Sequence, residues 1–573
     1  MMHCETCSAK ALEPHPSLGS EDEILQNLRG EGDLSFTDVS TIRKRLSDAQ
    51  SDLDAYESEI LRLQSRITTL TSTAGILRKR IEQTNFLLSP VRRLPNEILG
   101  DIFRESMPAG FVFTSHSHKF APPPFLTVCT RWRNVALSTP RIWTSLVLEL
   151  LSGTWQPQQI FGNFSALGHY LSLSKASPLH VAIHAQASVL MFEDPGHGYD
   201  TLIDSISRES SRLASLTFTS AKTDMTASTA VERLNKVEKF PRLRSLSVTC
   251  PVPESVISSI LKRSPNLTEL MITSFPSGPG SFTALSTITH LKLIVRKDAN
   301  VFKVLDMCPN LKSVMFSLEH DHSPNKEEVT ALCAHAPHKI PSLHDLSIEI
   351  IKKTRSWGRE DYFLLPTLLS SLTLPSIASI TLGSSQYKDS FSGKQTSNPL
   401  CTLTSLLNRS RSTLTSLTLD QLRITDMDVL TLLHLVSGLT HLTIHEPMPI
   451  DGTDPKPIIS HEFLKRLHSY DRGCTPLDPN SRRLVLPKLK HLSFTVLGKT
   501  FLAENEDQDL LELFVSVVAS RWLPEQGYGV ECIRFVKLRV IGKRVDRGVW
   551  NQLKYIDGLE VVLEDEDEPA VSD

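Results

Sequence analysis

The stretch STLTSLTL, residues 412–419, places leucines at its third, sixth and eighth positions. The same apolar spacing recurs in ten copies, which are SRLASLTF (211–218), PRLRSLSV (241–248), PNLTELMI (265–272), STITHLKL (286–293), PNLKSVMF (309–316), PSLHDLSI (341–348), PSIASITL (375–382), STLTSLTL (412–419), SGLTHLTI (437–444) and PKLKHLSF (487–494). The last residues of each copy alternate apolar and polar, which predicts a short β-strand with one buried face. A proline or serine opens each copy and indicates a turn before the strand.

Helix-compatible segments such as 425–438 lie between the copies. Strand, turn and helix repeated at spacings of 21–37 residues are typical of a leucine-rich-repeat solenoid. The sequence therefore predicts an α/β repeat fold over 175–563, an irregular solenoid shaped like a horseshoe. A wider gap before the last copy contains the polar segment 448–483, which we interpret as a surface insertion. The runs 533–540 and 558–563 are the expected last strands.

A heptad pattern dominates the segment before the repeats. Apolar residues from Leu53 to Leu88 follow a 3, 4 spacing, with Ala74 and Thr84 as the weak positions. This seam predicts a long helix or coiled coil over 41–89. Its partner is either a second chain, through self-association over residues 53–88, or a later segment onto which the helix folds back.

The heptad helix is expected to end at Pro90, because proline lacks an amide donor and disfavours helix at the preceding residue. A short helix is predicted in LPNEILGDIF (94–103), since proline suits a first helical turn. A second amphipathic helix is predicted from Leu126 to Ala136, and a third proline-led segment begins at Pro140. We expect residues 90–150 to form a small all-α module.

Three stretches of this module, LPNEILGDIF, VCTRWRNVA (128–136) and PRIW (140–143), together resemble the F-box family. The likeness is strongest to the large fungal group in which a heptad helix precedes the motif. The resemblance implies that the module binds the adaptor subunit of an SCF-type cullin-RING ubiquitin ligase and that the repeats hold a protein substrate. The adaptor-binding residues that it implies are Leu94, Pro95, Ile98, Leu99, Ile102, Phe103, Val128, Cys129 and Trp132.

The pattern alone explains each of these side chains equally well as part of the module's own core. A module of this size has little core of its own, which leaves an apolar face suited to a partner's groove with anchors at i and i+4. One stretch departs from the family pattern. The connection over 107–125 is long and contains Pro122, Pro123 and Pro124, so its path and any adaptor contacts there stay open.

Composition limits the other classes of function. The chain has 573 residues, 40% of them apolar, and a formal net charge of −3, so it lacks the broad basic surface that nucleic-acid binding requires. Nine dispersed cysteines indicate a reducing compartment, and no secretory signal or bilayer-length apolar run is found. We expect a cytoplasmic or nuclear protein with no membrane partner.

The polar segment 1–40 and the acidic tail 564–573 are expected to be disordered.

No residues typical of catalysis stand together in the sequence. LGKT (497–500) lacks the first glycine of a phosphate loop, and Cys4 with Cys7 forms a single CxxC pair without further zinc ligands nearby. We therefore expect no catalytic, cofactor or metal residue and no enzyme. Two hypotheses remain: a substrate-recruiting ligase subunit whose target is not identifiable from the sequence, or a scaffold that uses the coiled coil and the repeats without any link to a ligase.

Overall fold

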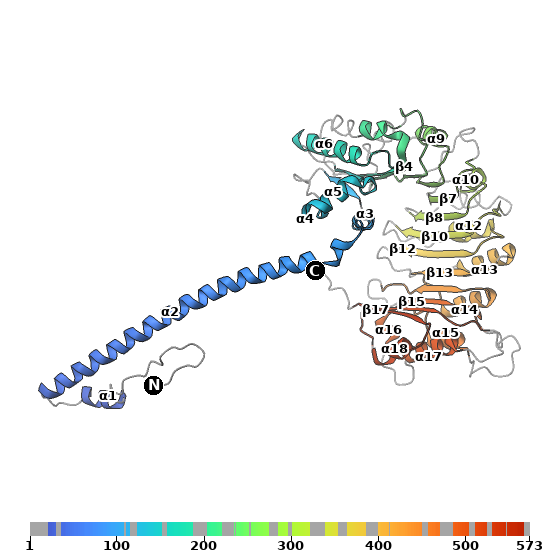
Figure 1. The fold of residues 1–573 in the computed structure, drawn as a ribbon. Helices are drawn as coiled ribbons and strands as arrows, with labels where there is room; N and C mark the ends of the chain where they lie inside the picture. Colours follow the sequence, from blue (N-terminus) through green and yellow to red (C-terminus); the bar gives the residue numbers. More distant parts are fainter. Residues whose placement is uncertain are drawn as a thin grey trace. The chain divides into compact units, whose positions relative to one another are not determined.

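The computed structural model contains two compact units, Met1–Leu99 and Gly100–Asp573 (Figure 1). The structure describes residues 21–29, 36–107, 110–114, 123–151, 157–186, 203–220, 234, 236–250, 252, 254–273, 285–295, 301–320, 338–352, 364–385, 399–411, 413–449, 456–469, 485–502, 510–523, 530–545 and 547–566.

The first unit is built around one long helix. After α1 (Glu21–Arg29), α2 runs unbroken over Phe36–Leu88 and is drawn in blue in Figure 1. The short 3₁₀ helix η1 (Pro90–Arg93) follows, and then α3 (Asn96–Glu105), which crosses the boundary between the units. The predicted long N-terminal helix is confirmed. It begins at Phe36, earlier than the expected residue 41. The prediction of disorder over residues 1–40 is wrong for α1, where Ile24, Leu25 and Leu28 have a spacing that permits a helix.

The second unit is built on one sheet of fifteen strands that follow one another in chain order. Neighbouring strands are parallel throughout. The strands are β1 (Phe111–Thr114), β2 (Ser145–Leu151), β3 (Leu179–Gln186), β4 (Leu213–Ser220), β5 (Ser245–Val248), β6 (Glu269–Ile272), β7 (His290–Val295), β8 (Ser313–His320), β10 (Asp345–Lys352), β12 (Ser379–Ser385), β13 (Ser416–Asp420), β14 (His441–His445), β15 (His491–Leu497), β16 (Phe535–Ile541) and β17 (Glu560–Glu566). A separate pair, β9 (His338–Lys339) with β11 (Leu372–Thr373), is also parallel.

One row of apolar residues crosses the whole sheet at the same register. It consists of Phe111, Leu146, Val181, Leu216, Leu246, Leu270, Leu291, Val314, Leu346, Ile380, Leu417, Leu442, Leu492, Val536 and Val561. All of these residues except Val561 at the last strand are buried. This aliphatic ladder is the structural meaning of the second apolar position in the repeated sequence phrase.

The sheet corrects the predicted fold class. The chain shows a fifteen-stranded parallel α/β sheet that extends into residues 90–150, and the predicted horseshoe-shaped leucine-rich-repeat solenoid is wrong. The repeated phrase predicts a strand with one covered face. It does not specify the connections between strands, which here are unequal, with seven residues in α10 (Val301–Met307) and thirteen in α17 (Leu510–Trp522).

The helices between the later strands lie along one side of the sheet (Figure 1). The helices of this layer include α9 (Glu254–Lys262), α10, α12 (Leu364–Ser370), α13 (Pro399–Ser410), α14 (Asp426–Leu435), α15 (His461–Leu467), α17 and α18 (Arg547–Lys554). From α12 to α18 each helix in this list packs against the next one. Buried and partly exposed residues alternate along the strands, as in β7 and β16. The helices therefore cover one face of the sheet, and the described chain leaves the other face accessible.

The segment 90–150 is not all-α, which corrects a second part of the predicted fold. It contains the helices α3, α4 (Phe125–Val128) and α5 (Thr130–Ser138) and the 3₁₀ helix η2 (Pro140–Trp143). It also supplies β1 and β2, the first two strands of the sheet. The long 107–125 connection thus contains a strand, because Phe111 and Phe113 alternate with Val112 and bury one side of it.

Two further boundaries differ from the sequence interpretation. Residues 456–469 belong to the segment interpreted as a surface insertion, 448–483, yet α15 lies there and buries Phe463, Leu464 and Leu467. The polar residues within and on either side of this short amphipathic helix conceal it in the sequence. Strand β17 extends to Glu566, so the first residues of the predicted acidic tail pair with β16. Residues 567–573 lie outside the described residues.

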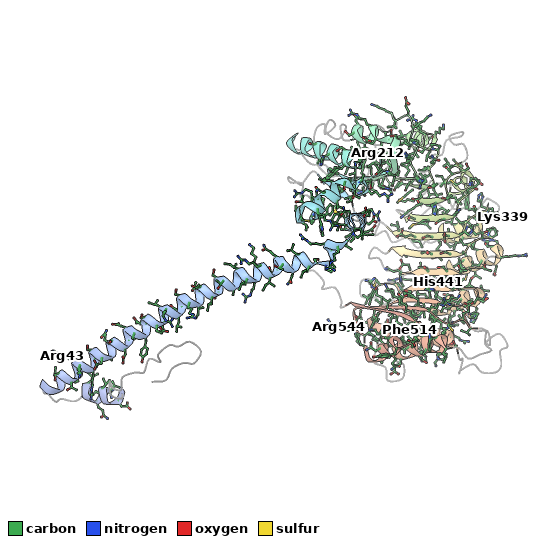
Figure 2. The ribbon with its side chains drawn as sticks, viewed as in Figure 1. Arg43, Arg212, Lys339, His441, Phe514 and Arg544 are labelled. Atoms are coloured by element: carbon green, nitrogen blue, oxygen red, sulfur yellow. The ribbon has the colours of Figure 1, made fainter. Side chains whose placement is uncertain are left out.

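Two arginines, the buried Arg212 and the exposed Arg409, connect helices of the second unit. Arg212, labelled in Figure 2, donates hydrogen bonds to Ser174 Oγ at 2.7 Å and to the carbonyl of Leu171 at 3.0 Å. Arg409 donates to the carbonyls of Leu369 and Leu372 at 2.8 and 3.0 Å. In each case the guanidinium satisfies carbonyls at or just beyond the end of an earlier helix, groups that have no partner within that helix.

Replacing Gly110 with alanine is expected to lower the free energy of unfolding by more than about 1–2 kcal/mol. Gly110 has a φ of +74°, and a Cβ there would lie 2.7 Å from the backbone oxygen of Ser145. Chemical denaturation followed by circular dichroism measures the change. Gly75→Ala is the matched control, because no atom lies within 4 Å of the added Cβ and alanine favours the helix. Equal stability of G110A and the wild type would contradict this backbone conformation.

Candidate partner-binding site

Helix α3 carries two pairs of apolar residues with opposite environments. Leu99 and Phe103 are buried, whereas Ile98 and Ile102 are 47% and 46% exposed. Residues four apart lie on the same side of a helix, so each pair forms its own stripe. The structure thus separates the four predicted contact residues into a core pair and an accessible pair.

Phe103 is held by rings from the next two helices. Its ring stacks on Phe125 of α4 at a centroid distance of 4.8 Å and lies 5.0 Å from Trp132 of α5. Gly100 lets α3 approach α5, since a Cβ at this position would lie 3.1 Å from Thr139 Oγ1. Phe103 and Trp132 therefore position the helices, and Phe103 is not available to a partner.

The remaining predicted residues have mixed positions. Pro95 and Val128 are exposed, and Leu94 is partly exposed. Cys129 caps the N-terminus of α5, where its Sγ accepts a hydrogen bond from the Trp132 amide at 3.5 Å. This geometry does not support an adaptor contact at Cys129, because the thiol is engaged in capping its own helix.

An aromatic cluster fixes the helical segment to the sheet. Trp143 of η2 stacks on Phe111 of β1 at 4.9 Å and on Tyr170 of α6 (Pro157–Leu173) at 5.1 Å. Its Nε1–H donates a hydrogen bond to the carbonyl of Ala136 at 2.8 Å. Burial raises the pKa of the Tyr170 phenol above its ordinary value. The sequence does not indicate that the ring partners of Trp143 come from a strand and a later helix.

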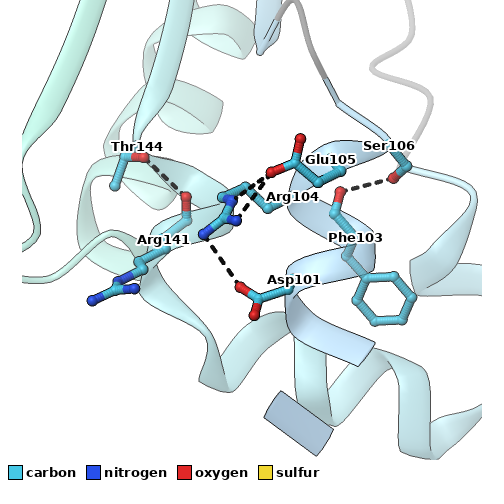
Figure 3. A network of polar contacts seen from close by, with 7 residues as sticks. All are labelled: Asp101, Phe103, Arg104, Glu105, Ser106, Arg141 and Thr144. Carbon is cyan, nitrogen blue, oxygen red and sulfur yellow. Dashed lines mark hydrogen bonds and ion pairs between the residues drawn. The ribbon is translucent and has the colours of Figure 1, made fainter. Parts of the chain in front are cut away.

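Charged residues border the exposed side of α3. Arg104 forms ion pairs with Asp101 at 3.2 Å and Glu105 at 3.0 Å, as Figure 3 shows. In the same view, the Ser106 hydroxyl donates to the carbonyl of Phe103 at 2.7 Å. These ion pairs are exposed, so they contribute little to stability but supply a polar rim next to Ile102.

The uncovered face of the sheet is the second accessible surface. Its first row consists of Ser145, His180, Ser215, Ser245, Glu269, His290, Ser313, Asp345, Ser379, Ser416, His441, His491, Phe535 and Glu560, each one residue before a member of the aliphatic ladder. None of these side chains is buried. Parallel sheets are usually covered on both faces, so a face of hydroxyl, imidazole and carboxylate groups of this extent is a candidate partner surface.

Three aromatic rings lie next to one another on this face across β14, β15 and β16, the first two stacked and the third tilted. His441, labelled in Figure 2, lies 4.1 Å from His491 with nearly parallel planes, and His491 lies 5.7 Å from Phe535. Partial burial lowers the pKa of His491 below its ordinary value, and the nearby His441 and Arg534 add to the effect. Nearby, His445 Nδ1 and Asp420 Oδ1 are 2.9 Å apart. The sequence phrase did not single out these histidines, although they occupy the same position in two copies.

Two buried ionisable residues are structural. Glu446 accepts hydrogen bonds from the backbone amides of Ile459 and Leu497, and burial raises the pKa of its carboxyl group. Burial lowers the pKa of Arg521 to about 10. Within the described residues, no group of His, Cys, Asp and Glu side chains could hold a metal ion. No helix in the same part of the chain is both long and apolar enough to cross a bilayer.

No protein-family model matches this chain, and no curated protein is significantly similar to it.

Proposed function

We propose that this chain is a substrate-recruiting subunit of a cullin-RING ubiquitin ligase that works in the cytoplasm or nucleus and has no catalytic residue of its own. The observation that carries the proposal is the exposed pair Ile98 and Ile102 on α3, whose other apolar pair is buried. An apolar pair one helical turn apart, bordered by charged residues, fits the groove of a helix-binding partner. The likeness of LPNEILGDIF to the F-box motif supports the ligase adaptor as that partner.

The accessible residues divide the predicted contacts into two roles. The proposed adaptor contacts are Pro95, Ile98, Ile102 and Val128, whose side chains are exposed, and Leu94, which is partly exposed. The residues assigned to holding these contacts in place are Leu99, Phe103, Cys129 and Trp132, which are buried or engaged within the chain.

The proposed mechanism is proximity. The adaptor links the chain to the ligase, and the uncovered face of the sheet, including His441, His491 and Phe535, binds the protein target. Holding a target near the activated ubiquitin raises the effective concentration of its lysines. Such a mechanism requires two separate protein-binding surfaces and no acid–base or nucleophilic group.

Replacing Ile98 and Ile102 together with aspartate is expected to weaken adaptor binding at least about 100-fold. The reason is that burying each isoleucine in the complex contributes roughly 1.5–3 kcal/mol to the binding free energy. The measurement is isothermal titration of the purified full chain with the adaptor subunit. Both isoleucines are exposed in the free chain, so circular dichroism and thermal unfolding should stay close to those of the wild type.

The matched control is Ile42→Asp with Leu46→Asp, an exposed apolar pair at the same spacing on α2. This variant should bind the adaptor as the wild type does. Unchanged binding by the Ile98/Ile102 variant contradicts the assignment of α3, and a wild-type chain that does not bind the adaptor contradicts the ligase function itself.

A scaffold without a ligase link is the second candidate, and the exposed seam of α2 favours it. Large apolar residues such as Ile60, Ile67 and Leu77 are exposed along this helix. A chain that self-associates but shows no adaptor binding in the same titration would support the scaffold.

A further inference from the structure

The seam of α2 is longer than the sequence pattern first indicated. The 3, 4 spacing continues backward from Leu53 through Ala49, Leu46, Ile42 and Val39, so it runs without a slip over nearly the whole helix. The large apolar side chains of this seam that are exposed, from Ile42 to Leu88, have exposed fractions between 45% and 66%. A helix of this length with such a stripe matches one strand of a coiled coil.

The residue types indicate two strands. In heptad notation with Leu53 at position a, isoleucine occupies a at residues 60, 67 and 81, and leucine occupies d at residues 63, 70 and 77. Isoleucine at a with leucine at d favours a two-stranded coil and, taken alone, suits a parallel pair. Whether the two strands run parallel or antiparallel depends on how the small and large residues of the seam face each other.

In a parallel pair each seam residue faces its own copy. Ala49 would face Ala49, Ala74 would face Ala74, and Tyr56 would face Tyr56, which alternates voids with crowded layers. In an antiparallel pair centred between Ile67 and Leu70, every small residue faces a large one. The layers are then Ala49–Leu88, Leu53–Thr84, Tyr56–Ile81, Ile60–Leu77, Leu63–Ala74 and Ile67–Leu70, with the second residue of each taken from the second copy.

The flanking charges select the same direction. In the antiparallel register, Glu57 faces Arg78 of the second copy and Glu59 faces Arg80, and symmetry doubles both pairs. In the parallel register, Asp52 would face Glu57 of the second copy, a repulsive contact that symmetry also doubles. Charges at these flanking positions set the orientation of coiled-coil strands.

We propose that α2 pairs with α2 of a second copy of this chain in an antiparallel coiled coil over residues 49–88. The occupant of the exposed seam is thus the same helix, and residues 36–48 extend beyond the overlap. This proposal rests on the layers and charges of α2 and does not depend on the ligase function.

The antiparallel direction places the two copies of Leu88 at opposite ends of the overlap. At 1.5 Å per residue, forty residues of helix hold them roughly 59 Å apart. Each chain continues from its own end into η1 and α3, so a dimer presents two separated copies of the α3 surface.

Charge reversal distinguishes the two directions in the full-length protein. In the antiparallel dimer, Glu57→Arg places two arginines opposite each other at two symmetric sites, and the dimer Kd at low salt should rise about tenfold. Arg78→Glu should weaken the dimer to a similar extent. The double variant restores both pairs with exchanged signs and should return the Kd to near that of the wild type. Sedimentation equilibrium gives these constants, and circular dichroism checks that helix content is kept.

Each alternative result overturns a stated part of the proposal. Tighter association of Glu57→Arg, which removes the Asp52–Glu57 repulsion, would show a parallel dimer. Failure of the double variant to recover would exclude this register. A wild-type chain that stays monomeric at every concentration measured would exclude the second copy as the occupant of the seam.

Discussion

Trp143→Ala is expected to lower the free energy of unfolding by about 3–5 kcal/mol, the range for removing a fully buried tryptophan from a packed core. The indole is enclosed by Phe111 and Tyr170 and donates its Nε1–H to the carbonyl of Ala136. Its loss leaves a cavity between η2, β1 and α6 and removes a donor from a buried carbonyl. Denaturant unfolding followed by circular dichroism measures the change.

Two variants make this result specific. Trp143→Phe keeps an aromatic ring in the stack but loses the hydrogen bond, and it should cost less than alanine. Tyr555, 86% exposed, provides the matched aromatic control, and Tyr555→Ala should stay within about 0.5 kcal/mol of the wild type. A Trp143→Ala protein as stable as the wild type would contradict the cluster. Because the cluster joins the helical segment to the sheet, the same variant should also weaken the proposed adaptor binding indirectly.

Arg521→Ala is expected to destabilise the second unit by about 3–5 kcal/mol, since it leaves three buried carbonyls without a donor at roughly 1–3 kcal/mol each, with incomplete additivity. Arg521 in α17 is fully buried and donates to the carbonyls of Leu467, Val485 and Leu486. These carbonyls belong to the end of α15 and to the turn before β15. Its removal should therefore loosen the contact between two consecutive connections of the sheet.

The expected loss of stability is large because the planar guanidinium of Arg521 donates to three carbonyls at once. Arg521→Lys keeps the charge but has no planar fork, so it should recover only part of the lost stability. The exposed Arg534, thirteen positions further along the chain, is the matched control, and its replacement by alanine should have an effect within about 0.5 kcal/mol. An equally small effect at Arg521 would show that the three hydrogen bonds contribute nothing net.

Local patterns made the helical N-terminal region predictable. The heptad spacing and Pro90 define where α2 ends, because both act through neighbours in the sequence. The repeated phrase likewise coincides with individual strands, as PSLHDLSI does with β10. The assembly of these strands was predicted wrongly, because the phrase describes one covered face and carries no information about the connections that determine the fold class.

The division of α3 into core and accessible residues required the structure. Ile98, Leu99, Ile102 and Phe103 are all apolar, and their spacing does not indicate which pair turns inward. The choice depends on Phe125 and Trp132, which lie more than twenty residues further along the chain. Arg521 was missed for a related reason, since an arginine in a helix usually faces solvent, and only its carbonyl partners show otherwise.

The two ends of the fifteen-stranded sheet have a consequence for solubility. An open sheet exposes unpaired amides and carbonyls on its edge strands, which invite pairing with another molecule. β1 at one edge is only four residues long. β17 at the other edge carries Glu560, Glu564 and Asp565, and a hydrogen bond from Lys537 lowers the pKa of Glu564. A short strand at one end and charged side chains at the other disfavour growth of the sheet by edge-to-edge aggregation.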